Sequence, residues 1–443
     1  MAVLSISKKD TSIVGIVRLP ASKSLSNRAL IIRYLSGKEF PIKNLSEADD
    51  TILLKRLLLK VKSSIPSEKE IILDCANAGT VFRFLTALLS MTPGKWLLTG
   101  SDRMKERPIG ILTDALRKLG AKIDYTEKEN YPPLLITGHH LKGSTLEMDA
   151  SVSSQFISAL LMIAPVLPKG LTVNLYGIIS SEPYLKMTLG LLKKFRVQSH
   201  FIENSIEIKN QAITPENITI EADWSSAAFW YEVAAFSSVA NIFLQGLTKE
   251  SLQGDAILPE IYKHFGVYST FEQAGTRLTK TEKVVDSFSF DFTNYPDLAQ
   301  AVIITCAGLN IPGEFTGLES LQIKETDRLS ALKTELQKLG YQIHITQNSE
   351  LRTSNFELRT PNPELKTLPI TSTFKIKKPT LINPYNDHRM AMAFAPLALI
   401  FGSIQIENPE VVSKSYPGFW EDFRKMGIIL KYNSSADKPS QTF

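Results

Sequence analysis

The segment TELQKLGYQIHI (residues 334–345) decides the fold, because it joins a helix directly to a strand. Leu336 and Leu339 have the spacing of a buried helical stripe, and Lys338 lies in the last turn, where a cation is favourable. Gly340 suits the left-handed conformation that ends a helix, and the alternation that follows is typical of a strand. The segment therefore predicts one α/β junction.

The same junction recurs along the chain. The further copies are DALRKLGAKID (114–124), LLKKFRV (191–197), IYKHFGVY (261–268) and DFRKMGIIL (422–430). Arg196 replaces the glycine in one copy, and a weaker sixth copy covers 53–61. Isolated junctions of this kind are common, but near-regular repetition indicates about six α/β units of roughly 75 residues each.

Two segments depart from this rhythm. Residues Asn348–Thr371 contain a seven-residue repeat of Glu-Leu-Arg/Lys-Thr that Pro361 and Pro363 interrupt, which argues against a coiled coil. We expect this segment to be a solvated low-complexity insertion, remote from function. We expect residues 434–443 to form a frayed tail.

Length and charge limit the class of protein. A chain of 443 residues exceeds a single hydrophobic core and predicts two or more domains. The net charge of +5 is spread out, without a run of five or six basic residues, which disfavours nucleic acid as a partner. Local cationic pockets for small anions are the better interpretation.

Cysteine usage and hydropathy point to a cytoplasmic protein. Cys75 and Cys306 have no metal-binding or redox spacing, and His139 and His140 are adjacent, so we expect no metal site. Residues 1–10 lack the apolar segment of a signal peptide, and the apolar run at 159–167 is too short to span a bilayer.

Clusters of hydroxyls, amides and cations open many of the expected helices. They are LPASKSLSNRA (19–29), NAGTVFR (77–83), RMKERPIG (103–110), SVSSQ (151–155), KETDR (324–328) and YNDHR (385–389), with Lys414 near the C-terminus. Helix N-termini favour anions. For any single cluster, a helix cap or surface ion pair explains the residues as well. Six such clusters in six units favour convergence on one anion-binding cleft.

These motifs, in this order from residue 15 to about 428, resemble those of the 3-phosphoshikimate 1-carboxyvinyltransferase (EPSP synthase) family. The resemblance implies an α/β chain with a two-domain enolpyruvyl transferase-like fold of six βαβαββ units, three per domain. It implies that residues 1–21 and 222–443 form one domain and 22–221 the other, with the active site in the cleft between them.

The resemblance also implies the reaction. The enolpyruvyl group of phosphoenolpyruvate passes to the 5-hydroxyl of shikimate 3-phosphate, with release of phosphate, in aromatic amino acid biosynthesis. Both substrates carry a carboxylate and a phosphate, so fixed cations must neutralise them. We expect no metal or organic cofactor and a monomeric protein.

Two substrate-binding sets follow from the resemblance. The shikimate 3-phosphate set is Lys23, Ser24, Arg28, Ser153, Ser154, Gln155, Ser181, Asp297 and Lys324, with Tyr184 nearby. The phosphoenolpyruvate set is Lys23, Gly79, Arg107, Gln155, Arg328, Arg389 and Lys414. Hydroxyls and an amide thus face the polyol phosphate, and guanidinium groups face the smaller anion.

The catalytic residues implied are Asp297 as base and Glu325 as proton donor, with Lys23 able to share the donor role. Without the resemblance, Asp297 after Pro296 would be interpreted as a turn residue. Carboxylates among cations usually have lowered pKa values, so a donor Glu325 needs burial or bound substrate anions to gain its proton. The sequence leaves this tension open.

Some positions depart from the family pattern. Ala21 and Ala76 replace common glycines, Phe84 stands where proline is frequent, and Ser320 stands where asparagine is usual. We expect the bulk of Phe84 to shift Gly79 and to alter inhibitor sensitivity.

Two rival functions remain. UDP-N-acetylglucosamine enolpyruvyl transferases share the fold but usually have a reactive cysteine in the loop that is Arg103–Pro108 here, where this chain has none. An inactive anion-binding homologue is the other rival, and the retained Asp297, Glu325 and cations argue against it.

Overall fold

The structure is a computed structural model that describes residues 2–64, 69–151, 153–282, 285–348, 362–368 and 379–433. The chain forms two compact units. Unit 1 contains residues 1–20, 222–251 and 255–443, and unit 2 contains 21–221 and 252–254. The short segment 252–254 is held in unit 2 because the Leu252 N–H and the Gln253 amide donate to the Glu221 carboxylate, at 3.3 and 3.2 Å.

The described residues of unit 2 form two four-stranded sheets and one two-stranded sheet. Its strands are β3 (Ile42–Lys43), β4 (Glu70–Asp74), β5 (Gly94–Thr99), β6 (Lys122–Tyr125), β7 (Leu134–Gly138), β8 (Thr145–Asp149), β9 (Leu171–Tyr176), β10 (His200–Ile202), β11 (Ser205–Ile208) and β12 (Ile218–Thr219). The sheet orders are β4-β5-β7-β6, β8-β9-β11-β10 and β3-β12.

The helices of unit 2 alternate with these strands. They are α1 (Lys23–Leu35), α2 (Asp49–Ser63), α3 (Gly79–Met91), α4 (Asp102–Lys105), α5 (Gly110–Lys118), α6 (Ser154–Ile163) and α7 (Glu182–Lys194). Nearly every residue of α3 and α6 is buried, so these apolar helices form the centre of the core.

In unit 1, the part of the chain that the structure describes forms three four-stranded sheets. Its strands are β1 (Val3–Ser7), β2 (Ser12–Arg18), β13 (Val239–Gln245), β14 (Val267–Glu272), β15 (Gly275–Lys280), β16 (Phe288–Asp291), β17 (Gly313–Thr316), β18 (Gln342–Asn348), β19 (Asn362–Leu368), β20 (Leu381–Ile382), β21 (Ser403–Glu407) and β22 (Ile429–Asn433). The sheet orders are β2-β13-β15-β14, β16-β17-β19-β18 and β20-β21-β1-β22.

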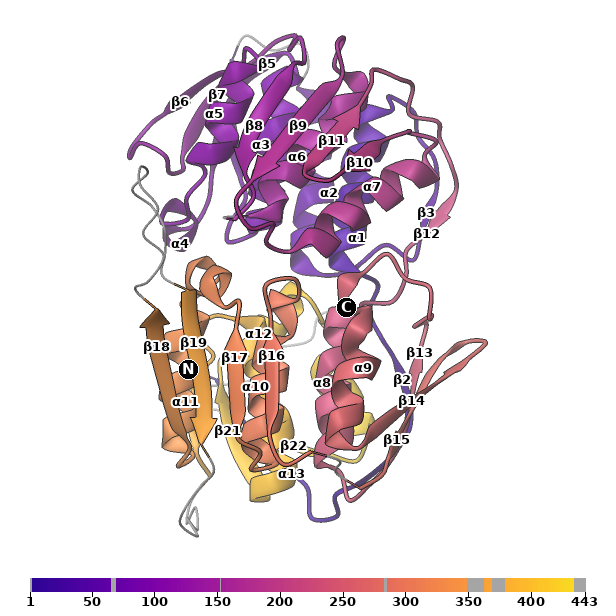
Figure 1. Ribbon diagram of the computed structural model, residues 1–443, viewed down its shortest axis with the longest axis vertical. Helices are drawn as coiled ribbons and strands as arrows, with labels where there is room; N and C mark the ends of the chain where they lie inside the picture. Colours follow the sequence, from indigo (N-terminus) through magenta and orange to yellow (C-terminus); the bar gives the residue numbers. More distant parts are fainter. Residues whose placement is uncertain are drawn as a thin grey trace. The chain divides into compact units, whose positions relative to one another are not determined.

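The helices of unit 1 include three that are almost entirely buried. They are α8 (Trp224–Phe236), α10 (Ala299–Gly308) and α12 (His388–Phe394), and each packs against the other two. The remaining helices are α9 (Leu258–Tyr262), α11 (Arg328–Lys338), α13 (Ala398–Phe401) and α14 (Phe419–Lys425). Figure 1 shows α10 behind β16 and β17.

The five four-stranded sheets formed by the described residues share one topology. Two strands pair in parallel around a helix, and a second helix leads into an antiparallel hairpin, so that the strand order is first, second, fourth, third. In the last sheet, the N-terminal strand β1 takes the fourth position between β21 and β22. This βαβαββ arrangement confirms the predicted α/β fold class.

The repeated helix-to-strand junctions are also confirmed. Their turn residues have left-handed φ angles of 103° at Gly120, 63° at Arg196, 74° at Gly266, 87° at Gly340 and 75° at Gly427. The sixth copy is helix α2, and within the described residues its unit has only the short parallel pair β3 and β12. The sixth unit is therefore abbreviated.

The prediction of a solvated insertion over Asn348–Thr371 is wrong for Asn348, which ends β18, and for residues 362–368. The latter residues form β19, which pairs with β17 on one side and β18 on the other. Pro363 lies near the start of β19, opposite Gln347, where proline is tolerated. The proline-interrupted repeat concealed this strand. Residues 349–361 and 369–371 of the predicted insertion, and the predicted tail 434–443, lie outside the described residues.

Across the described ranges, no helix has both the length and the apolar character that crossing a bilayer requires.

Candidate active site

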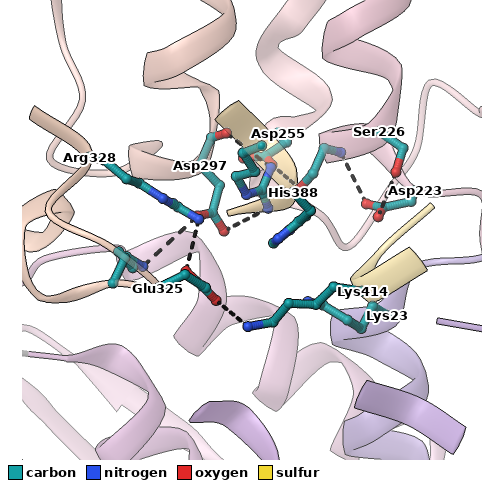
Figure 2. A network of polar contacts seen from close by, with 12 residues as sticks. Lys23, Asp223, Ser226, Asp255, Asp297, Glu325, Arg328, His388 and Lys414 are labelled. Carbon is teal, nitrogen blue, oxygen red and sulfur yellow. Dashed lines mark hydrogen bonds and ion pairs between the residues drawn. The ribbon is translucent and has the colours of Figure 1, made fainter. Parts of the chain in front are cut away.

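Arg328, the first residue of α11, organises the polar centre of unit 1 (Figure 2). Its Nε lies 2.7 Å from Asp387 Oδ2, its Nη2 lies 2.9 Å from Glu325 Oε2, and its Nη1 lies 3.4 Å from Asp297 Oδ1. Burial of this side chain lowers the pKa of Arg328, but the surrounding Asp387, Glu325 and Asp297 outweigh burial and raise it above its ordinary value. The guanidinium is therefore a permanent charge shared by three carboxylates.

Asp297 lies in a short 3-10 turn, Pro296–Leu298, directly before α10. Besides Arg328, it faces Arg389 Nη2 at 3.2 Å and Lys324 Nζ at 3.9 Å. Arg389 Nη1 also donates to the backbone carbonyl of Asp297 at 3.1 Å. The predicted base is thus surrounded by cations that hold its carboxylate in one place.

Glu325 lies between two cations of unit 1. Its Oε2 faces Arg328, and its Oε1 lies 3.3 Å from Nζ of Lys414, the last residue of the 3-10 segment Pro409–Lys414. Lys414 and Glu325 are each about one-eighth exposed. The structure therefore brings together, within unit 1, the predicted residues Asp297, Lys324, Glu325, Arg328, Arg389 and Lys414.

Asp387 is a functional candidate that the sequence prediction missed. It caps α12, since its Oδ1 accepts from the Arg389 N–H at 2.9 Å, and its side chain is fully buried against Arg328. The signal was present in YNDHR, where an acidic residue precedes two basic ones at a helix start.

Asp255 was also missed, and no motif marks it. Its carboxylate is buried and accepts a hydrogen bond from the Ser225 hydroxyl at the start of α8. The charges of Asp297 and Arg389 both influence its pKa. Burial and then the charge of Asp297 raise the pKa of Asp255 to about 7, against the opposing effect of Arg389. Figure 2 shows Asp255 beside Asp297.

In unit 2, three helices meet at Arg28, whose side chain is buried. Its Nε donates to Thr188 Oγ1 on α7 at 2.8 Å, its Nη2 to Ser158 Oγ on α6 at 3.2 Å, and its Nη1 to the Ser24 carbonyl at 3.1 Å. Among the described residues, these hydrogen-bond acceptors are all neutral. Burial lowers the pKa of Arg28 to about 10, so the side chain still carries its charge at neutral pH.

The predicted hydroxyl and amide residues open the same helices. Ser153 caps α6, its Oγ accepting from the Gln155 N–H at 3.3 Å, and Ser154 lies one turn before Ser158. Ser181 precedes α7 with a left-handed φ of 60°, one turn before Tyr184, whose ring centroid lies 5.9 Å from Arg28 Cζ. The shikimate 3-phosphate residues predicted in this unit thus lie on α1, α6 and α7, the helices that meet at Arg28.

Gly79, the first residue of α3, lies against two guanidinium groups. A Cβ atom at this position would lie 2.5 Å from Arg83 Nη1 and 2.7 Å from Arg107 Nη1, so a larger residue would require these guanidinium groups to shift. The sequence prediction named Gly79 and Arg107 together but missed Arg83, although it stands in the same NAGTVFR motif.

Lys23, the first residue of α1, forms a 3.0 Å ion pair with the buried carboxylate of Asp50. It belongs to unit 2, whereas Asp297 and Glu325 belong to unit 1. Asp50, at the start of α2, is a partner that the sequence prediction did not name.

The departures from the family pattern have different consequences. Ala76 has a left-handed φ of 47°, where glycine would be less strained, whereas Ala21 does not. Phe84 is buried with its ring centroid 5.3 Å from Arg28 Cζ, so its bulk contacts Arg28. The Ser320 hydroxyl is buried and has no hydrogen-bond partner among the described residues.

Comparisons with known proteins agree with this arrangement. The model of the family "EPSP synthase (3-phosphoshikimate 1-carboxyvinyltransferase)" matches residues 7–423. A 3-phosphoshikimate 1-carboxyvinyltransferase from Bacteroides fragilis is 46% identical over 95% of this chain and 97% of its own. One from Haemophilus influenzae is 32% identical over 95% of this chain and 98% of its own.

Solved structures show the same fold. An EPSP synthase from Acinetobacter baumannii has a TM-score of 0.71 at 22% identity, over 98% of this chain and all of its own. The enolpyruvyl transferase NikO from Streptomyces tendae has a TM-score of 0.70 at 14% identity, over 98% of this chain and 99% of its own. By its family match and its 46% identical relative, this chain belongs to the EPSP synthase (3-phosphoshikimate 1-carboxyvinyltransferase) family.

Proposed function

We propose that this chain is a transferase that moves the carboxyvinyl group of phosphoenolpyruvate to the 5-hydroxyl of shikimate 3-phosphate and releases phosphate. The observation that carries the proposal is the series of ion pairs Lys414–Glu325–Arg328–Asp297–Arg389 in unit 1. It places an acid candidate and a base candidate on one shared guanidinium, among cations suited to phosphate and carboxylate. The family match and the relatives' printed names support the same reaction.

The proposed chemistry assigns one proton transfer to each carboxyl group. Asp297 removes the proton of the 5-hydroxyl, and Glu325, with Lys23 sharing the role, protonates the methylene carbon of phosphoenolpyruvate. The hydroxyl oxygen then bonds to the neighbouring carbon, giving a tetrahedral intermediate. The phosphate then leaves and takes one proton of the new methyl group with it, which produces the carboxyvinyl ether.

The binding residues divide between the units. We propose that shikimate 3-phosphate contacts Lys23, Ser24, Arg28, Ser153, Ser154, Gln155 and Ser181 of unit 2 and Asp297 and Lys324 of unit 1. We propose that phosphoenolpyruvate contacts Lys23, Gly79, Arg107 and Gln155 of unit 2 and Arg328, Arg389 and Lys414 of unit 1. Arg28, whose described hydrogen-bond acceptors are neutral, is suited to a substrate phosphate.

The binding of substrate must change the ion pairs of unit 1. Asp297, Glu325 and Asp387 already balance much of the charge of Arg328, Arg389 and Lys414. A phosphate or carboxylate of the substrate must therefore compete with these internal carboxylates. We propose that this competition supplies the proton on Glu325, because an incoming anion favours the neutral form of a neighbouring carboxyl.

The rival transfer to UDP-N-acetylglucosamine has no support from the cysteines of this chain. Cys75 and Cys306 are both fully buried, and burial raises the pKa of each thiol. Neither provides the exposed reactive thiolate that such a loop cysteine requires.

The test is an assay of phosphate release with both substrates. We expect turnover with shikimate 3-phosphate and none with UDP-N-acetylglucosamine, and we expect Asp297→Ala and Glu325→Ala to lose most of it. Asp286→Ala, which removes an exposed carboxylate outside the ion-pair network, is the matched control. A folded wild-type protein that releases no phosphate would refute the proposed activity, and full turnover by either site variant would refute that residue's role.

Because the proposed contacts come from both units, each must reach the same pair of substrates. Solution scattering with and without both ligands tests this requirement. We expect a smaller radius of gyration with the ligands bound, and an unchanged value would count against a shared site.

A further inference from the structure

The turn before α12 has an unusual backbone. Tyr385 and Asn386 are consecutive non-glycine residues with left-handed φ angles of 54° and 56°. Asparagine adopts this conformation readily, but it is disfavoured for a bulky residue such as Tyr385 and persists there only when surrounding contacts impose it. Within the three residues that follow, Asp387 pairs with Arg328 and Arg389 pairs with Asp297. The strained turn therefore sets the direction in which two site residues leave the backbone.

The buried carboxylate of Glu335 accepts hydrogen bonds from this turn. Glu335, on α11, is fully buried, and its Oε1 accepts from the Tyr385 hydroxyl at 2.8 Å. Its Oε2 accepts from the Asn383 N–H at 3.2 Å. The Asn383 side chain in turn accepts from the Tyr385 N–H at 2.7 Å. Glu335 thus fixes both the backbone and a side chain of the segment that leads into the strained pair.

The charge of Glu335 has its own partner. Lys338, one turn later on α11, contacts both carboxylate oxygens at 2.8 and 2.6 Å and also reaches the Leu381 carbonyl at 3.4 Å. Burial raises the pKa of Tyr385 to about 12, with the neighbouring Glu335 adding to the effect, so the phenol remains a hydrogen-bond donor at neutral pH. The contacts that Glu335 makes with Asn383, Tyr385 and Lys338 therefore form without any substrate.

The same helix contacts both ends of the turn. Arg328 begins α11 and binds Asp387, while Glu335 lies two turns later and binds Asn383 and Tyr385. Both contacts link α11 to residues 383–387, so a shift of this segment moves Asp387 and Arg389 relative to Asp297.

We propose that Glu335 is a positioning residue of the transferase, which holds the Asn383–Asn386 turn so that Asp387 and Arg389 meet Arg328 and Asp297 in productive geometry. This inference rests on the proposed function. Glu335 touches no reacting atom in this arrangement, and it acts through the turn. Small misplacements of charged groups cost large factors in rate, about 100-fold for a shift of about 1 Å.

The experiment compares Glu335→Gln and Tyr385→Phe with the wild type in steady-state phosphate release. Glutamine keeps the shape but has one acceptor oxygen in place of two, and phenylalanine removes only the hydroxyl. We expect kcat to fall about 10-fold to 100-fold in Glu335→Gln and less in Tyr385→Phe. We expect KM for phosphoenolpyruvate to rise, because Arg389 is in its proposed set, and KM for shikimate 3-phosphate to change less than about twofold.

Gln337→Ala is the matched control, since it removes an exposed side chain from the same helix. It should match the wild type. Circular dichroism and melting temperature report folding, and Tyr385→Phe keeps the inference testable where Glu335→Gln is unstable. Unchanged kinetics in folded Tyr385→Phe, or equal rises of both KM values, would overturn the positioning role. Absence of turnover in the wild type would instead refute the proposed function.

Discussion

Arg328 Nε lies 2.7 Å from Asp387 Oδ2, and both side chains are almost entirely buried. This pair joins the first residue of α11 to the residue that caps α12. Buried pairs of this kind are costly to break, because the remaining charge loses its partner without regaining water. The pair therefore links the stability of unit 1 to the geometry of its ion-pair network.

Replacing Arg328 with lysine should show that shape matters beyond charge. Lysine keeps one positive charge but cannot reach Asp387, Glu325 and Asp297 together. We expect Arg328→Lys to lower kcat/KM at least about 100-fold and to lower the free energy of unfolding by about 3 kcal/mol. Steady-state kinetics and chemical denaturation measure the two effects. If kcat/KM and the free energy of unfolding both stayed at their wild-type values, the separate contacts of the guanidinium group with the three carboxylates would be dispensable.

Much of the fold could be predicted from the sequence because its signals are local. The helix, its turn residue and the next strand are neighbours in the chain, so the junctions at Gly120, Arg196, Gly266, Gly340 and Gly427 carry their own pattern. Strand β19 could not be predicted in this way, because prolines interrupt its local pattern and its partner β17 lies far away in the sequence.

The residues of the candidate site also fall into those that a local sequence pattern marks and those that it does not. The helix-start motif KETDR marked Glu325 and Arg328 as candidates, since polar residues there are conspicuous. Asp297 was named only through the resemblance to the family, and Lys414 stands apart from the helix-start clusters. Asp255 could not be predicted, because it comes close to Ser225 and Asp297 only in the folded chain. Asp387 stands in a recognisable motif, but its ion pair with Arg328 forms only in the tertiary structure.

Binding of phosphoenolpyruvate should be accompanied by uptake of protons at Glu325. In the free protein, Arg328 and Lys414 flank this carboxyl group, and an anionic ligand that takes these cations favours its neutral form. Calorimetric titration with phosphoenolpyruvate alone, in buffers of different ionisation enthalpy, measures the net number of protons.

Glu325→Gln is the matched variant for this titration, because it removes the ionisation and keeps the shape. It also corrects for proton exchange by the ligand phosphate itself, whose second pKa is near 6. We expect lower proton uptake in Glu325→Gln than in the wild type. Equal uptake in both proteins would assign the protons elsewhere.

Asp255 should make the KM for phosphoenolpyruvate depend on pH near neutrality. Its pKa is about 7, because burial and Asp297 disfavour its charged form. Above pH 7 it becomes an anion beside Arg389, where it competes with a substrate carboxylate. We expect KM for phosphoenolpyruvate to rise about fivefold between pH 6 and pH 8.5, which corresponds to about 1 kcal/mol. In Asp255→Asn this rise should be absent, and an identical profile would exclude Asp255 as its source.

Glu232 should make the protein less stable as pH rises, independently of the site. Its carboxyl on α8 is fully buried, and neither oxygen has a hydrogen-bond partner among the described residues. Burial raises the pKa of Glu232 well above its ordinary value of 4.5. The folded state thus keeps a proton that the unfolded state releases above that value. The contribution of Glu232 to the free energy of unfolding is therefore greatest below pH 4.5. As pH rises above this value, the free energy of unfolding falls by at most about 1.4 kcal/mol per pH unit.

Glu232→Gln removes this proton linkage and leaves a neutral side chain of the same shape. We expect the free energy of unfolding of the wild type, measured by urea denaturation between pH 5 and pH 8, to fall more steeply with pH than that of Glu232→Gln. Glu250→Gln, at an exposed position, should follow the wild-type curve. If Glu232→Gln also followed it, the carboxyl would have to be ionised in the folded protein, and a compensating positive charge would have to reach it.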